Sequence, residues 1–232
     1  MKVVFTYLPI RLADITEIYL KYSIENLNRQ NIIPIIYSDK NYFKNIGLNY
    51  DWCEFDIDEK FKINTLWSYP KIKVLSQINY PFIHLDNDFI VKDLNYLISK
   101  IEFDRLNLSH RHKMDLDKSS VFIEIFKKYT KETLPFNTLN NTCVISTSNY
   151  KILNKAFLDV CNLIENDISF FSTKINNIPP ITLNQQYLNL FFNDINYLFD
   201  KNPNFEYLEK YGVCHMIEKK NHNKFISKSK LL

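Results

Sequence analysis

The chain has 232 residues, 46% of them hydrophobic, and a formal net charge of +3, which is typical of one globular domain of moderate size. The modest charge argues against a nucleic-acid-binding surface, and no uninterrupted apolar stretch is long enough to span a bilayer. Because glycine occurs only at Gly47 and Gly212, the chain contains neither a GxGxxG dinucleotide fingerprint nor a Walker loop.

Residues 1–104 predict alternating strands and helices. A buried strand is expected at 2–8, a helix from a capping box at Asp14 to about Arg29, and a second buried strand at 32–37. This β-α-β order predicts that the two strands run parallel in one sheet. The next predicted elements are a short strand at 51–57, a helix at 66–78 with Pro70 near its start, a strand at 82–85 and a helix at 93–101.

The pattern weakens between residues 105 and 138, where only a helix at 121–129 is expected. The later predicted elements are a strand at 142–146, a helix at 149–164, a helix at 183–192 and a short strand at 197–200. We find no internal repeat and no linker, and the tail from Lys219 onward is basic and polar. The sequence therefore predicts a single α/β domain over 1–232, with a mixed, mainly parallel central sheet flanked by helices.

The four cysteines are widely spaced and form no CxxC pair. This spacing argues against a zinc or redox motif and against a dense disulfide framework. Near the N-terminus, Arg11 and Asp14 interrupt the apolar residues, so this region lacks the layout of a signal peptide. We therefore expect a cytoplasmic protein with reduced thiols.

Two carboxylates, Asp86 and Asp88, stand one residue apart between the apolar runs Pro81–Leu85 and Phe89–Val91. In an extended segment both side chains would project from the same face. Ionised acids beside a hydrophobic core need compensation, and Mg²⁺ or Mn²⁺ supplies it by binding carboxylate and phosphate oxygens. An exposed turn with two solvated acids is the alternative interpretation. The apolar flanks favour a metal–diphosphate site.

Two other Asp-x-Asp triplets lack this context. Asp56-Ile-Asp58 continues into a polar stretch, and Asp115-Leu-Asp117 lies among lysines. Both are predicted to be solvated loop acids.

Ligands of open α/β sheets bind beyond the carboxyl ends of the strands. The polar groups expected at these ends are Thr6 and Tyr7 after the first strand, Ser38 and Asp39 after the second, the acid pair, and the region after Ser146. We expect these residues to line a single cleft, in which the Tyr7 ring could stack on a nucleobase.

The segment Ile83-His-Leu-Asp-Asn-Asp-Phe-Ile90 resembles the DxD motif of the GT-A glycosyltransferases, a family that uses nucleotide sugars. The resemblance implies a Rossmann-like GT-A fold, with Mn²⁺ or Mg²⁺ held by Asp86 and Asp88 at the donor diphosphate. It also implies that Asn87 lies at the donor and that a UDP-sugar is the favoured donor. The same resemblance divides the chain into a nucleotide-sugar-binding half at 1–104, an acceptor-side half at 105–218 and a basic tail at 219–232.

The segment 140–147 is similar to a GT-A strand that touches the acceptor and the donor sugar. It matches at Asn141 but carries Cys143, Ser146 and Thr147 where glycines are common. An ordinary strand after a polar turn is the alternative.

The segment 182–188 is similar to an acid–glutamine pair at a helix start in the same family. Here Asn184 replaces the acid and Gln185 follows it. The resemblance implies catalytic roles for Asn141 and Gln185 beside Asp88, whereas a helix with two solvated amides is the alternative for Gln185.

The segment 211–220 resembles a C-terminal GT-A element in which a histidine is the third protein ligand to the metal and a lysine meets the diphosphate. The matching residues are His215, Lys219 and Lys220. Imidazole can complete a carboxylate site and ammonium groups attract phosphate, although an isolated histidine is more often structural or on the surface.

The segment 66–74 resembles a helix that presents an aromatic and a basic residue to the donor. Trp67 and Lys71 are four residues apart and share a helical face. The alternative is a core tryptophan and a solvated lysine.

Taken together, the resemblance implies a metal-dependent, hexosyltransferase-like glycosyltransferase that moves a sugar from a nucleotide sugar to a glycan or glycolipid acceptor in bacterial polysaccharide or glycoconjugate synthesis. Two alternatives remain open: a catalytically silent GT-A-like nucleotide-binding protein, and a metal-dependent nucleotidyltransferase or phosphohydrolase. The basic tail could contact a membrane surface peripherally, or it could be solvated.

Overall fold

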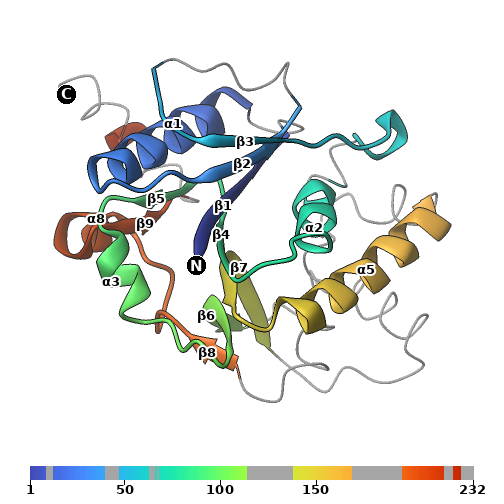
Figure 1. Cartoon of the computed structure of the whole chain (residues 1–232). Coiled ribbons are helices and arrows are strands. Elements are labelled where there is room, and N and C mark those ends of the chain that lie inside the picture. The colour runs from blue at the N-terminus through green and yellow to red at the C-terminus, as the bar shows by residue number, and fades with distance from the viewer. Residues whose placement is uncertain are drawn as a thin grey trace.

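The computed structural model describes residues 1–8, 13–39, 47–62, 66, 68–113, 138–168, 195–216 and 222–225. A seven-stranded sheet with the strand order β3-β2-β1-β4-β7-β6-β8 forms its centre (Figure 1). The strands are β1 (Lys2–Tyr7), β2 (Ile35–Ser38), β3 (Asp51–Glu54), β4 (Phe82–Leu85), β6 (Leu106–Lys113), β7 (Thr138–Thr147) and β8 (Ile195–Tyr197). Of these strands only β7 runs against its neighbours, so the predicted mixed, mainly parallel sheet is confirmed.

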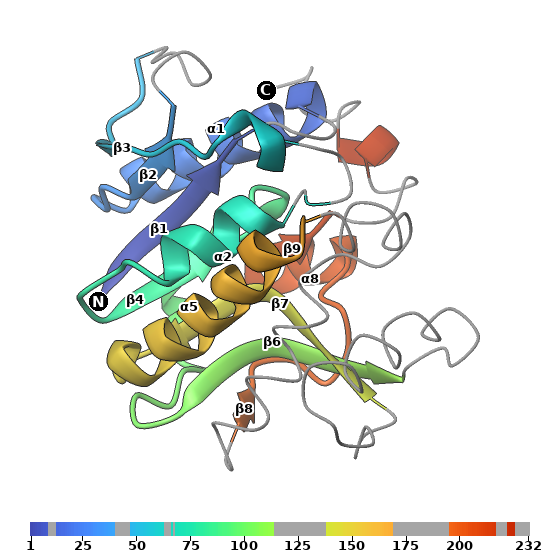
Figure 2. The same ribbon diagram turned by 90° about the vertical axis from the view of Figure 1, so that its right-hand side faces the viewer.

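Helices cover both faces of the sheet. Helices α2 (Tyr69–Leu75) and α5 (Tyr150–Asn166) pack together on one face, as Figure 2 shows, and α1 (Ala13–Arg29) and α3 (Leu94–Ile98) pack on the other. Strand β1 shows how the sequence supports both layers: Val4 enters the core below α2 and α5, whereas Val3 and Phe5 enter the core below α1. This alternation follows from the pleat of a strand buried on both faces. None of the helices in the described ranges is long and apolar enough to cross a membrane.

A second, two-stranded sheet lies beside the main one and pairs β5 (Phe89–Val91) with β9 (Val213–His215) in antiparallel fashion. Helix α8 (Phe205–Tyr211) leads into β9 through Gly212, which has a φ of 73°. Glycine adopts this left-handed conformation at little cost. A Cβ at Gly212 would also lie 2.6 Å from the Asp93 Cβ. Gly212 therefore permits the sharp turn that brings β9 against β5.

Some elements differ from those predicted. Strand β6 could not be predicted from hydrophobic alternation, because three of its side chains are polar yet buried: Asn107, Ser109 and His110. Their polar groups have partners inside the fold; the Asn107 side-chain amide, for example, donates to the Glu102 carbonyl at 2.8 Å. The predicted strand at 142–146 extends over 138–147, the one at 51–57 ends at residue 54, and the one at 197–200 instead spans 195–197. The predicted helices at 121–129 and 183–192 lie outside the described residues.

Glu165 joins α5 to α2. Its carboxylate accepts a hydrogen bond from the Tyr69 hydroxyl at 2.5 Å and forms an ion pair with Lys73 at 2.7 Å. Burial alone would raise the pKa of Glu165, but the contacts with Lys73 and Tyr69 outweigh burial, so that this pKa lies below its ordinary value. A group with a lowered folded-state pKa stabilises the fold fully above its unfolded pKa, which is about 4.3 for glutamate. That stabilisation is lost as the pH falls through the folded pKa.

We expect Glu165→Gln to lower the free energy of unfolding by about 1 kcal/mol at pH 7, a modest value because the pair is partly exposed to solvent. The difference from wild type should shrink at pH 3, since the wild-type carboxylate becomes protonated. Urea unfolding at the two pH values measures this change. Glu102→Gln is the control, because its pair with Arg105 is exposed and should contribute little. A difference that is as large at pH 3 as at pH 7 would contradict the assigned ion pair.

Candidate metal and donor site

The acid pair occupies a tight turn at the carboxyl end of β4, in the middle of the main sheet. The Asp86 amide donates to the Cys143 carbonyl at 2.9 Å, which continues the pairing with β7 by one residue. The Phe89 amide then donates back to the Asp86 carbonyl at 2.9 Å, and the chain enters β5. The prediction that both carboxylates project from one extended strand is therefore wrong, because β4 ends at Leu85. The turn brings the two acids together instead.

His215 reaches the acid pair through the small sheet. It lies opposite Phe89 in the pairing of β9 with β5, and the Met216 amide donates to the Asp88 carbonyl at 2.9 Å. The imidazole is 4% exposed. Main-chain pairing thus fixes a residue near the C-terminus beside a turn that is more than a hundred positions earlier in the sequence.

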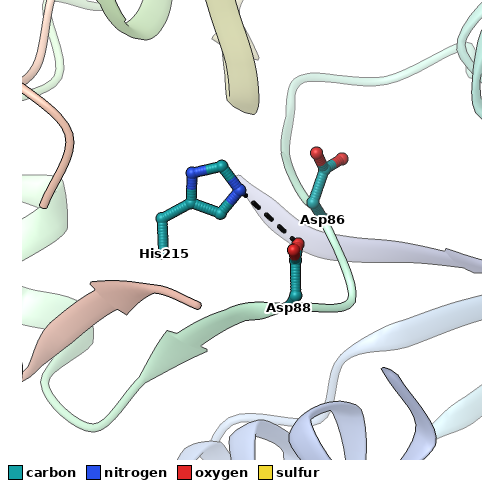
Figure 3. Close-up of side chains that lie close together, drawn as sticks. All are labelled: Asp86, Asp88 and His215. Carbon is teal, nitrogen blue, oxygen red and sulfur yellow. Dashed lines mark ion pairs between the residues drawn. The ribbon is translucent and has the colours of Figure 1, made fainter. Parts of the chain in front are cut away.

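Asp86, Asp88 and His215 form one cluster, with a carboxylate oxygen or ring nitrogen from each lying within 4.8 Å of the others. Figure 3 shows the His215 ring directed at Asp88, with Nε2 3.6 Å from the Asp88 Oδ1. Burial raises the pKa of the Asp88 carboxyl, and the nearby Asp86 charge raises it further, while His215 opposes the change. Two oxygen ligands and one nitrogen ligand suit Mn²⁺ or Mg²⁺ and leave positions for phosphate and water. The residues present therefore fit a divalent cation.

Asn202 is a site residue that was not predicted from the sequence. Its side-chain oxygen lies 3.0 Å from Nδ1 of His215. Since an amide oxygen only accepts, Nδ1 is the donor in this contact, and Nε2 is the ring nitrogen that faces the acids. Nothing in the loop sequence distinguishes Asn202 from other polar loop residues, so only the three-dimensional placement shows its role.

We expect Asn202→Ala to weaken Mn²⁺ binding about 10-fold, the lower end of the usual effect of removing an outer hydrogen bond to a metal-binding histidine. Asn204→Ala is the matched control from the same loop. The Asn204 side chain accepts from the Glu206 amide at 3.1 Å and caps α8. Its loss should lower stability by about 1 kcal/mol without changing the affinity for Mn²⁺. Titration of both variants with Mn²⁺ decides the question; equal affinities would argue against the role of Asn202.

Lys71 lies inside the site. Its ammonium group donates to the Asp86 Oδ1 at 2.6 Å and to the Thr142 carbonyl at 2.5 Å, and the residue is 8% exposed. The alternative of a solvated lysine is therefore wrong. The group contacts a carboxylate of the acid pair.

The other predicted residues on β1 and in the acid turn have defined partners. The Asn87 side chain donates to the Thr6 carbonyl at 2.8 Å and so ties the turn to β1. The Thr6 hydroxyl lies 3.0 Å from Nε2 of His84. The Tyr7 ring is 1% exposed and its hydroxyl donates to Glu17 on α1, a placement that does not fit the predicted stacking on a nucleobase.

Asp39 follows β2 at the same edge of the sheet and is partly exposed. The Asn141 side chain accepts from the Cys143 amide at 2.9 Å and so braces its own strand. Four predicted site residues lie outside the described residues. They are the predicted donor contacts Trp67, Lys219 and Lys220 and the predicted catalytic residue Gln185.

No protein-family model and no curated protein matches this chain, but solved structures do. The galactosyltransferase LgtC, in complex with donor and acceptor sugar analogues, matches with a TM-score of 0.50 and 16% identity over 85% of this chain and 73% of LgtC. The glycosyltransferase GlyE of Streptococcus pneumoniae TIGR4 matches with a TM-score of 0.51 and 16% identity over 95% of this chain, which spans 56% of GlyE.

A glycosyltransferase involved in the glycosylation of the major capsid of PBCV-1 matches with a TM-score of 0.51 and 11% identity, over 96% of this chain and 97% of that protein. At these identities the likeness concerns the fold. The chain has the fold of GT-A glycosyltransferases.

Proposed function

We propose that this protein is a metal-dependent glycosyltransferase that moves a sugar from a nucleoside diphosphate sugar to an acceptor. The observation that carries the proposal is the cluster of Asp86, Asp88 and His215 at the carboxyl edge of a GT-A sheet. This edge is where open α/β sheets bind their ligands. The fold alone leaves the activity open, whereas the cluster supplies ligands for the cation that such a donor brings.

The cation, when bound, would stabilise the charge that develops on the departing diphosphate. The protein's own groups hold its ligands in place. Lys71 fixes the orientation of the Asp86 carboxylate, and Asn202 holds the His215 ring so that Nε2 faces the acids. The turn between β4 and β5 fixes Asp88. The site is thus organised before the donor arrives, which reduces the ordering cost of binding.

The remaining assignments extend this proposal. Asn87, Thr6 and Asp39 would lie along the nucleotide, and Trp67 with Lys71 would lie beside the donor. Lys219 and Lys220 would meet the diphosphate, because ammonium groups are effective point charges for phosphate. Asn141 and Gln185 would contact the reacting sugars.

We propose a UDP-sugar as donor, a hexose as the transferred sugar and a glycan or glycolipid as acceptor, in a cytoplasmic step of bacterial polysaccharide or glycoconjugate synthesis. The basic tail at 219–232 could hold the protein at the membrane where a lipid-linked acceptor resides.

A melting-temperature screen tests the proposal. A ligand that binds only the folded state raises the melting temperature by mass action. We expect UDP-sugars to raise it with Mn²⁺ present and to have little effect when EDTA removes the metal. GDP-sugars and CMP-sugars complete the panel. A melting curve that no nucleotide sugar moves in the presence of Mn²⁺ would contradict the proposed function.

A further inference from the structure

The Lys71 ammonium group is held from two sides of the site. It donates to Oδ1 of Asp86 at 2.6 Å, to the Thr142 carbonyl at 2.5 Å and to the Thr142 hydroxyl at 3.3 Å. An ammonium group has three N–H donors, so these contacts use all of them. The side chain is 9% exposed, and it comes from α2 while its carbonyl partner belongs to β7. The position of the ammonium group is therefore fixed by groups on two different elements of the fold.

The position of Lys71 changes the charge that an approaching cation meets. Asp86 and Asp88 would offer two negative charges, but the fixed ammonium group cancels one of them. It also stands against the carboxylate that the cation must bind. Charges in such a shielded place interact more strongly than exposed charges and are screened less by salt. A divalent cation alone therefore gains less from this site than from the same acids without Lys71.

A nucleoside diphosphate replaces the negative charge that Lys71 cancels. Its phosphate oxygens bring further negative charge to the open side of the cation, where they are ligands as well as counter-charges. The gain is largest when metal and diphosphate bind together, because each compensates the charge of the other.

We infer that Lys71 is a built-in counter-ion for Asp86 that makes metal binding depend on the nucleoside diphosphate. In the empty site it neutralises one carboxylate. In the loaded site it keeps Oδ1 of Asp86 oriented, and the second carboxylate oxygen remains for the metal. The protein then takes up the cation as a complex with its donor and binds free cation poorly. This inference rests on the proposed function, since it concerns the same metal site.

The same helix supplies a matched control. Lys73 is two residues from Lys71 on α2 and also forms an ion pair with a carboxylate, Glu165, at 2.7 Å. That carboxylate lies on α5 and belongs to no cluster of potential metal ligands among the described residues. Replacing Lys73 removes a positive charge from α2 without touching Asp86.

The test measures the affinity for Mn²⁺ by paramagnetic resonance or calorimetry, with Mn²⁺ alone and with UDP or GDP added. Wild type should bind Mn²⁺ weakly when no nucleotide is present. With its nucleoside diphosphate it should bind Mn²⁺ at least about 10-fold more tightly, because one charge in a shielded site changes a binding free energy by this order of magnitude. Lys71→Met should bind Mn²⁺ alone at least about 10-fold more tightly than wild type and show a smaller gain from the nucleotide. Lys73→Met should behave as wild type.

Lys71→Gln is a second neutral variant, for the case that Lys71→Met does not fold. Glutamine removes the charge but keeps a hydrogen-bond donor for Asp86. This variant should share the tighter binding of Mn²⁺ alone. Unchanged or weaker binding of Mn²⁺ alone by a folded neutral variant would overturn the inference, as would tight binding of Mn²⁺ alone by wild type. If no nucleoside diphosphate improved Mn²⁺ binding by wild type, the proposed function would be contradicted instead. The measurement with Mn²⁺ alone therefore distinguishes a failure of the Lys71 inference from a failure of the proposed function.

Discussion

Asp88→Asn is expected to abolish sugar transfer, with a fall in kcat/KM of about 10³-fold or more, because it removes a metal-binding charge at the leaving diphosphate. The protein should stay folded. Burial raises the pKa of the Asp88 carboxyl, so burial disfavours the ionised form in the empty protein and a neutral amide of the same shape should cost little stability. The melting temperature should be unchanged or higher. Steady-state kinetics and a melting curve measure the two effects.

Asp56→Asn is the control, since Asp56 belongs to the other described Asp-x-Asp triplet. The structure refines the prediction of a solvated loop acid: the Asp56 carboxylate lies 2.8 Å from the Lys62 ammonium group, although its side chain is 47% exposed. This pair is a surface contact worth less than about 1 kcal/mol, and activity should not change. If the two substitutions lowered activity equally, or if Asp88→Asn unfolded the protein, the assignment of Asp88 would be wrong.

His215→Ala is expected to weaken Mn²⁺-dependent nucleotide binding by about 100-fold, an order of magnitude for the loss of one protein ligand. Asp86→Asn should have a similar effect and still accept a hydrogen bond from Lys71. Because both act through one cation, the double variant should be little worse than either single variant. Calorimetric titration of the nucleotide with Mn²⁺ present measures the three affinities.

The structure also sets the expected stability of these variants. His215 is buried and bonded to Asn202, so His215→Ala should lower the free energy of unfolding by about 1 kcal/mol even without metal. Additive losses of affinity in the double variant would mean that His215 and Asp86 act through different groups. The third-ligand role of His215 would then be rejected.

The sequence predicted the fold correctly where a run of apolar residues forms a buried strand. The apolar runs of β1, β2 and β4 predicted the parallel half of the sheet, and the break in the third run located the acid pair. The resemblance to GT-A enzymes placed His215 beside the acids. These predictions depend on short segments whose geometry follows from their own residues.

The sequence was uninformative where distant segments decide the outcome. Strand β6 buries polar side chains that find partners elsewhere in the fold, such as Asn107 with the Glu102 carbonyl, so no apolar alternation marks it. Strands β5 and β9 have only three residues each and exist through their mutual pairing. The contacts of Lys71 with Thr142 and of Asn202 with His215 join residues that are well separated in the sequence. A local sequence pattern cannot predict such contacts.

We propose that Asp86, Asp88 and His215 together hold one divalent cation at the phosphates of the donor. Anomalous diffraction at the manganese edge, from crystals grown with Mn²⁺ and the nucleotide that raises the melting temperature most, tests it directly. We expect a single strong peak within ligand distance, roughly 2.0–2.4 Å, of one atom from each of the three side chains and of the nucleotide phosphates. Bound nucleotide with its manganese peak at another place, or with the His215 imidazole far from the peak, would contradict it.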